Sequence, residues 1–382
     1  MIRFSFSNRF YYLIGIGFIA FFAFWLIRTG ALKQAAIDFA LNSVNMTCPD
    51  GLKETTFSYI ITPDGFMTAA VQTTAKAYDS GSFLTLKDDK INENFFDTEN
   101  SLSVSSSSQS SSPNQPKLLP ISTVSLKPKS NEGYIINNNV YVKNESSKTI
   151  DLKAIMAEAL KFKISKASKG PQVLIFNTHA TEAFNEGGKA EYTEGVYPRS
   201  DDDSKNVAAV GETIAKELTA NSIKVVQDKT HHDGPSYNGA YTRSLATVNQ
   251  YLKKYPTIKI VLDIHRDSLV SNTGEQYRPV ANIGGKSAAQ IMILVGLGTK
   301  ALPNSHYKEN LKFAALLQSD LESKYAGLCR PILLRDSRYN EHTAEGALLI
   351  EIGSSGNTIE EAQYSGTLLA KSLSGIIKKY AK

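Results

Sequence analysis

Cysteine is scarce in this sequence, and its scarcity limits the kinds of site that the chain can build. The 382 residues include only two cysteines, Cys48 and Cys329. Two cysteines so far apart predict neither a disulfide framework nor a zinc site made of thiolates. A bound metal would therefore need histidine and carboxylate ligands. Histidine is also scarce, and the candidates are His179, His231, His232, His265, His306 and His342.

The sequence also lacks a dense block of basic residues. Its 42 Lys and Arg side chains are nearly balanced by 37 Asp and Glu side chains, and the formal net charge is +5. A nucleic-acid-binding surface normally needs clustered positive charge, so we expect no nucleic-acid partner. The length of the chain suits one sizeable catalytic domain with smaller accessory parts.

One long apolar run is present near the N-terminus. Residues 10–27 carry no charge and are just long enough to cross a bilayer as a helix. Arg3 and Arg9 come before the run and Trp25 lies near its far end, which predicts a cytoplasmic N-terminus. We therefore expect residues 1–30 to be a single-pass membrane anchor, with the rest of the chain outside the cytoplasm. A cleaved signal peptide is the alternative, but no small-residue cleavage site follows the run.

Composition divides the remainder into three parts. Residues 31–95 mix helical and strand patterns and predict a small membrane-proximal region. Residues 96–131 are rich in Ser and Pro, which is typical of a flexible linker. From 132 to 382, strand-like runs alternate with helical patterns, which predicts an α/β domain with a mostly parallel sheet flanked by helices. The expected strands are 171–179, 223–228, 258–267, 288–296 and 346–357, and the expected helices are 206–222, 241–256, 309–325 and 360–382.

Three of the expected strands carry, near their ends, side chains that a metal-dependent hydrolase needs. His179 ends the first strand, His265 lies near the end of the third, and Glu351 lies in the last. Because ligands bind beyond the carboxyl ends of strands in open α/β sheets, these residues should gather at one edge. A single histidine at a strand end is more often structural, but the coincidence of three such residues favours a site.

The surroundings of His179 indicate how a metal could be held. Glu182 follows three residues later, and a His-x-x-Glu turn can offer two ligands to one zinc ion, with His265 as the third. Three protein ligands leave a fourth position for water, as catalytic zinc sites do. Zinc would acidify that water and polarise the scissile carbonyl. Glu351, on a separate strand, would act as the general base and later return the proton to the leaving nitrogen.

Neighbouring polar residues could support this site. In a strand, Asp263 and His265 project to the same face, so Asp263 is a candidate partner for the second imidazole nitrogen. Arg243 and Arg266 could hold substrate carboxylates, with surface ion pairs as the alternative. His232 could contact water or substrate, or could be a solvated loop residue.

Several motifs resemble those of the stage II sporulation protein P family. The segments are PQVLIFNTHATEAF, KNVAAVGETIAKEL, DKTHHDGPSYNGAYTRS, IKIVLDIHRDS, RYNEH and LLIEIGSSGNTIEEA, and the similarity extends over about residues 132–380 and the N-terminal anchor. The resemblance implies a zinc-dependent N-acetylmuramoyl-L-alanine amidase of the amidase-3 fold, with crosslink endopeptidase activity also attributed to the family. It further implies cleavage of septal peptidoglycan during engulfment, together with the sporulation transglycosylase D and the membrane protein M.

The resemblance also assigns site residues. The two histidine ligands and the catalytic glutamate of the family match His179, His265 and Glu351, in that order. The middle ligand stays open. The His-x-x-Glu spacing favours Glu182, the amidase-3 pattern points to the acidic run that ends at Asp203, and Glu194 is a third choice.

Two other functions fit parts of this pattern. A zinc carboxypeptidase that trims stem peptides would use the same ligands, and its products would be shortened stems instead of peptide-free muramic acid. A non-catalytic scaffold that binds the cell wall would keep the fold but would have no need of a base at Glu351.

Overall fold

The computed structural model describes residues 117–165 and 168–380 with their side chains, and the backbone of four strands before residue 93. The apolar run at 10–27, where we predict a membrane anchor, lies outside the described residues. Among the helices that are described, none combines the length and the apolar character needed to cross a bilayer. Contacts divide the chain into two units, residues 1–78 and 79–382. In the first unit, β1 (Thr55–Ile61) pairs antiparallel with β2 (Met67–Thr73).

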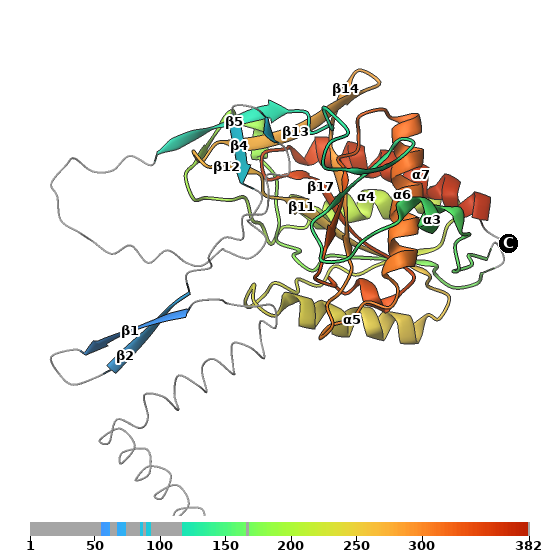
Figure 1. Cartoon of the computed structure of the whole chain (residues 1–382), viewed down its shortest axis with the longest axis horizontal. Helices are drawn as coiled ribbons and strands as arrows, with labels where there is room; N and C mark the ends of the chain where they lie inside the picture. The colour runs from blue at the N-terminus through green and yellow to red at the C-terminus, as the bar shows by residue number, and fades with distance from the viewer. Residues whose placement is uncertain are drawn as a thin grey trace, which may run out of the picture. The chain divides into compact units, whose positions relative to one another are not determined.

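The second unit is built on a mixed sheet (Figure 1). Its strands within the described residues are β6 (Ile135–Asn137), β7 (Val140–Asn144), β8 (Val173–Phe176), β10 (Val225–Gln227), β11 (Ile260–Asp267), β15 (Ile291–Gly296), β16 (Ile332–Arg335) and β17 (Gly346–Ser354). Four parallel strands in the order β10, β8, β11 and β17 form one half. β15 joins antiparallel to β17, β16 and β7 follow in parallel, and β6 pairs antiparallel with β7.

Helices cover both faces of this sheet, and for this reason β8, β11 and β17 are buried along their whole length. The larger core lies under α3 (Leu152–Ala157), α4 (Val207–Ala220), α6 (Tyr307–Lys324) and α7 (Ile359–Tyr380). On the other face, α5 (Ala240–Lys254) packs over β8 and β11 (Figure 1). Val261 of β11 contacts the α5 side, and side chains alternate along a strand. Asp263 and His265 therefore project to the face that α5 covers.

A second, smaller sheet forms part of the same unit, and it corrects the prediction of a linker at 96–131. β5 (Leu118–Val124) pairs with β13 (Gln276–Ile283) and with β9 (Glu191–Thr193), so the last part of that segment is built into the domain. Residues 96–116 lie outside the described residues. β4 (Asp89–Asn92) pairs with β12 (Val270–Ser271) and with β3 (Thr85–Leu86), which places the end of the predicted 31–95 region in this sheet as well.

The predicted α/β class is confirmed, and two details of the sheet differ from the prediction. β15 runs against its neighbour β17, so the sheet is mixed. The strand expected at 288–296 is broken at Gln290, where β14 (Lys286–Ala289) leaves to pair with β13. The buried side chain of Gln290 accepts a hydrogen bond from the amide of Leu126 and donates one to the carbonyl of Gly327. Apolar residues continue on both sides of Gln290, so the sequence pattern does not reveal the break.

Candidate metal centre

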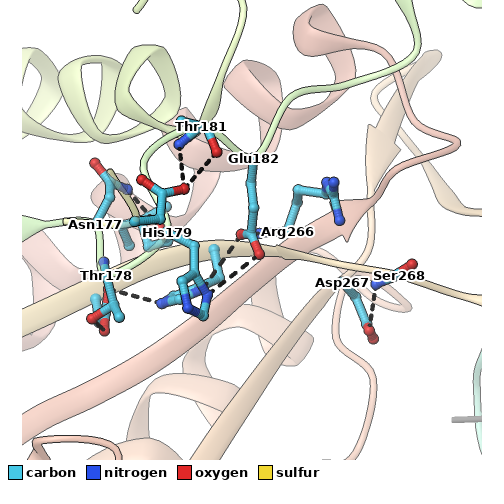
Figure 2. Close-up of polar contacts among 12 residues, drawn as sticks. Asn177, Thr178, His179, Thr181, Glu182, Arg266, Asp267 and Ser268 are labelled. Atoms are coloured by element: carbon cyan, nitrogen blue, oxygen red, sulfur yellow. Dashed lines mark hydrogen bonds and ion pairs between the residues drawn. The ribbon is translucent and has the colours of Figure 1, made fainter. Parts of the chain in front are cut away.

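His179 and Glu182 lie on one tight turn that follows β8. The backbone amide of Glu182 donates to the carbonyl of His179, and the amide of Val207 at the start of α4 donates to the carbonyl of Glu182. Both side chains are buried, with 7% of His179 and 8% of Glu182 exposed. The first of these hydrogen bonds closes a turn between His179 and Glu182, and the second ties the turn to α4. The two side chains therefore point to the same side (Figure 2).

These two side chains meet His265, which lies near the carboxyl end of β11. Oε1 of Glu182 lies 3.6 Å from Nδ1 of His179, and Oε2 lies 3.4 Å from Nδ1 of His265. One ligand atom from each of the three residues lies within 4.8 Å of the others, and all three residues are buried. The two imidazole rings are nearly perpendicular, with their centroids 5.1 Å apart.

This donor set fits a small tetrahedral cation. Zinc binds imidazole nitrogen and carboxylate oxygen at about 2.0–2.2 Å, so two ligands of one tetrahedral ion lie about 3.3 Å apart. The separation from Oε2 to His265 is 3.4 Å and that from Oε1 to His179 is 3.6 Å; each is close to that value, although they involve different oxygens of Glu182. The three residues therefore suit an ion with one further coordination position.

The second nitrogen of His265 faces Asp263. Nε2 of His265 lies 2.9 Å from Oδ1 of Asp263, at ion-pair distance, although the ring N–H is not aligned for a hydrogen bond. Thr178 holds the Asp263 carboxylate in place by donating from its amide at 2.8 Å and from its hydroxyl at 2.6 Å. Asp263 therefore holds the Nε2 edge of the His265 ring, which faces away from Glu182. The Nδ1 atom of the ring is left pointing toward Glu182.

Charges around Glu182 favour its ionised form. Burial opposes ionisation, but His265, His179 and Arg266 together hold the pKa of the Glu182 carboxyl well below its usual value. The backbone amide of Arg266 also donates to Oε2 of Glu182 at 3.1 Å. Burial likewise opposes a charged His265, yet the carboxylates of Asp263 and Glu182 raise the pKa of its imidazole well above the usual value. A cation bound at this point would take the place of the histidine proton.

Glu351 lies beside this group on β17, where the strand register pairs it with His265 of β11. The residue is 1% exposed, and neither carboxylate oxygen has a hydrogen-bond partner within the described part of the chain. Burial raises the pKa of the Glu351 carboxyl well above its usual value; His265 opposes this shift, and Asp267 and Glu182 add to it. A buried carboxyl of this kind is suited to accept and release a proton.

The two other choices for the middle ligand lie elsewhere. Oδ1 of Asp203 is 2.8 Å from Nε2 of His231, on a partly exposed surface. Glu194 is exposed and pairs with Lys117 at 3.0 Å. Among the described residues, Glu182 is the carboxylate that the fold brings to both histidines.

The remaining candidates make structural contacts around the site. The ring nitrogens of His232 lie 2.9 Å from a backbone carbonyl and 2.9 Å from a threonine hydroxyl, and the residue is 2% exposed, so it is not a solvated loop residue. Arg266 is 4% exposed and donates to the carbonyls of Ala183 and Pro198, so the alternative of a surface ion pair is wrong. Arg243 donates to the carbonyl of His232 at 2.6 Å. Both arginines brace the loops that carry the site.

Two tyrosines that the sequence analysis did not single out enclose His179. The ring of Tyr237 stacks on the imidazole with centroids 4.1 Å apart, and its hydroxyl lies 3.2 Å from Nδ1. Tyr241, in the first turn of α5, packs edge-on at 5.5 Å. Both belong to the segment DKTHHDGPSYNGAYTRS, but an aromatic residue next to Gly and Pro is an ordinary loop feature, so only the fold reveals their place.

Comparisons with known proteins agree with the resemblance noted in the sequence. The family model described as stage II sporulation protein P matches residues 76–374. The stage II sporulation protein P of Bacillus subtilis (strain 168) is 29% identical over 209 residues, which cover 52% of this chain and 49% of that protein. The chain therefore matches about half the length of this relative.

Solved structures of N-acetylmuramoyl-L-alanine amidases are also similar to part of the chain, at low TM-scores. The enzyme from Mycobacterium smegmatis has a TM-score of 0.33 and 12% identity, and the match covers 56% of this chain and 100% of that one. The enzyme from Clostridium difficile 630 has a TM-score of 0.32 and 16% identity, with 56% and 97% covered. For the amidase of Nostoc punctiforme the values are 0.34 and 15%, with 56% and 98% covered.

The family match extends over most of the chain and includes every residue of the site described above. It begins before the smaller sheet and ends within α7, so it takes in the whole of the main sheet. This chain belongs to the stage II sporulation protein P family.

Proposed function

We propose that this chain is a membrane-anchored, zinc-dependent peptidoglycan hydrolase of the N-acetylmuramoyl-L-alanine amidase type, which acts on the septal cell wall during sporulation. The observation that carries the proposal is the convergence of His179, Glu182 and His265 beside the buried carboxylate of Glu351. Membership of the stage II sporulation protein P family supports the cell-wall substrate and the sporulation setting.

In this proposal the residues of the site have separate tasks. His179, Glu182 and His265 hold the metal, and Asp263 orients the ring of His265. A bound zinc ion supplies a Lewis acid that polarises a carbonyl and acidifies water. Glu351 accepts a proton from the attacking water and returns it to the leaving amide nitrogen.

The proposal extends to location and partners. The apolar run at 10–27 supports a single-pass anchor that leaves the catalytic domain outside the cytoplasm. From the resemblance of the sequence motifs we further propose joint action with the sporulation transglycosylase D and the membrane protein M, and crosslink endopeptidase activity beside the amidase activity.

Metal analysis of the detergent-solubilised full-length chain, together with digestion of purified sacculi, tests the proposal. We expect about one zinc per chain and products in which muramic acid has lost its stem peptide. Separated stems that stay attached to muramic acid would indicate crosslink cleavage, and stems shortened from their carboxyl end would indicate a carboxypeptidase. Intact sacculi after incubation with the zinc-loaded protein and its candidate partners would leave a binding scaffold as the better description.

A further inference from the structure

A line of buried polar groups leads from His265 to the loop that carries Asn340. Asp263 faces His265 at 2.9 Å, and the hydroxyl of Thr178 donates to Asp263 at 2.6 Å. The Thr178 hydroxyl lies 2.8 Å from that of Ser244 on α5. The side-chain amide of Asn340 in turn donates to the Ser244 hydroxyl at 3.1 Å.

The donors along this line can be ordered. The proton of the Thr178 hydroxyl goes to Asp263, so its contact with Ser244 requires Ser244 to donate. Asn340 can only donate through its amide nitrogen, so the Ser244 oxygen accepts from it. The carbonyl of Tyr241, at 3.3 Å, is a longer alternative acceptor for Ser244. The Asn340 amide also donates to the carbonyl of Tyr241 at 2.8 Å, which is shorter than its contact with Ser244, and its two N–H groups allow both bonds. The donors along the line can therefore all point one way, from Asn340 to the carboxylate that faces His265.

Burial makes this line rigid. Thr178 and Ser244 are fully buried, and Asp263 and Asn340 are 2% and 7% exposed. A buried polar group that loses its partner cannot replace it with water, so each member is held to the next.

The loop that presents Asn340 is itself clamped in an unusual conformation. Tyr339 and Asn340 have φ values of 44° and 61°, in the left-handed region that a bulky tyrosine rarely adopts. The next residue, Glu341, fixes the loop because its carboxylate accepts from the amides of Gly296 at 2.6 Å and Leu349 at 3.1 Å. These amides belong to β15 and β17, and β17 also carries the proposed base.

We infer that Asn340 and Ser244 are positioning residues for the metal ligand His265. Through Thr178 they hold Asp263 in the orientation that keeps Nε2 of His265 on the far side and Nδ1 toward the metal position. The clamped loop thereby tunes metal affinity from outside the ligand set. This inference rests on the proposed metal site, and it adds a determinant that the three ligands alone do not supply.

Zinc affinity of the full-length protein, measured by competition with a chelator, tests the inference. Ser244→Ala removes one hydroxyl and keeps a good helix former, and Asn340→Asp keeps the shape and the left-handed conformation but removes the donor. Each variant should weaken zinc binding by on the order of 10-fold, the lower end of the effect of losing an outer-shell partner. The visible spectrum of the cobalt-substituted protein should change with it, because the His265 ring is held less tightly.

Ser372→Ala is the matched control, since Ser372 is a fully buried helical serine in α7, away from this line. It should keep the wild-type zinc affinity and cobalt spectrum. Unchanged affinity and spectrum in both line variants, with zinc bound by the wild type, would overturn the positioning role alone. Loss of the metal-free fold in both variants would also overturn it, because the line would then be only structural. A wild-type protein that binds no zinc would instead overturn the proposed function.

Discussion

Replacing Glu351 with glutamine separates proton transfer from metal binding. Glutamine has nearly the shape of glutamate but cannot exchange a proton at neutral pH. Glu351 is not among the residues whose ligand atoms cluster, so Glu351→Gln should keep its zinc. Hydrolysis of purified sacculi should fall by about 10²-fold or more, the usual contribution of a general acid–base group. That loss corresponds to about 2.7 kcal/mol on the activation barrier.

The stability of the metal-free variant gives an independent readout. Burial raises the pKa of the Glu351 carboxyl above its ordinary value of about 4.3. The unfolded chain therefore releases this proton at a lower pH than the folded chain, and ionisation at neutral pH favours unfolding. Glutamine cannot ionise, so Glu351→Gln should unfold at the same temperature as the wild type or higher at pH 7. The difference should vanish below about pH 4, where the carboxyl is protonated in both states.

Three measurements decide the matter: zinc content and release of soluble fragments from sacculi for the zinc-loaded protein, and thermal unfolding for the metal-free protein. Glu194→Gln is the control, because Glu194 is an exposed glutamate in a surface pair with Lys117. It should match the wild type in all three. If Glu351→Gln digests sacculi at the wild-type rate with zinc bound, the assignment of the base is wrong.

The remaining predictions concern the ligands, the loop brace and the membrane. Alanine at His179 or Glu182 should abolish zinc binding in a metal assay, whereas Asp203→Ala should keep it, because Asp203 pairs with a surface histidine. Zinc lost in Asp203→Ala and kept in Glu182→Ala would make Asp203 the ligand. Arg266→Lys removes the planar fork that reaches two backbone carbonyls and should lower the free energy of unfolding by about 1–3 kcal/mol in urea titrations. A reporter fused to the C-terminus should lie outside the cytoplasm and fractionate with membranes, and release of a shortened soluble form would contradict the anchor.

The parts of the fold that could be predicted from sequence are those with strong local patterns. The run VLIF before His179 and the run IVLDIHRD around His265 read as buried strands, and they are neighbours in the sheet. The rule that sites form at the carboxyl ends of strands then places both histidines at one edge. The three-residue spacing between His179 and Glu182 brings both side chains to one site if the chain forms a hydrogen-bonded turn there, and the structure has this turn.

The parts that escaped prediction depend on contacts between distant segments. Ser and Pro dominate the surroundings of β5 and predict a linker there, yet pairing with β13 and β9 gives this segment a place in the smaller sheet. Arg266 carries a charge that normally lies at a surface, but two backbone carbonyls of a distant loop satisfy it in the interior. Tyr237 and Tyr241 surround His179 only because the start of α5 returns to the end of β8. None of these pairings has a signal in the local sequence.

The two buried glutamates near His265 differ in their surroundings, and this difference argues for separate roles. The Glu182 carboxylate accepts a hydrogen bond from a backbone amide and lies against two imidazole rings. Its negative charge is therefore stabilised at neutral pH, as a permanent metal ligand requires. The Glu351 carboxyl is buried and accepts no hydrogen bond from the described residues. Its charged form is therefore costly, and its proton is readily exchanged. Exchanging the roles would leave the metal with a ligand that resists ionisation and the reaction with a base whose charge is already neutralised. The packing around each carboxylate therefore supports Glu182 as the group that holds the cation and Glu351 as the group that moves the proton.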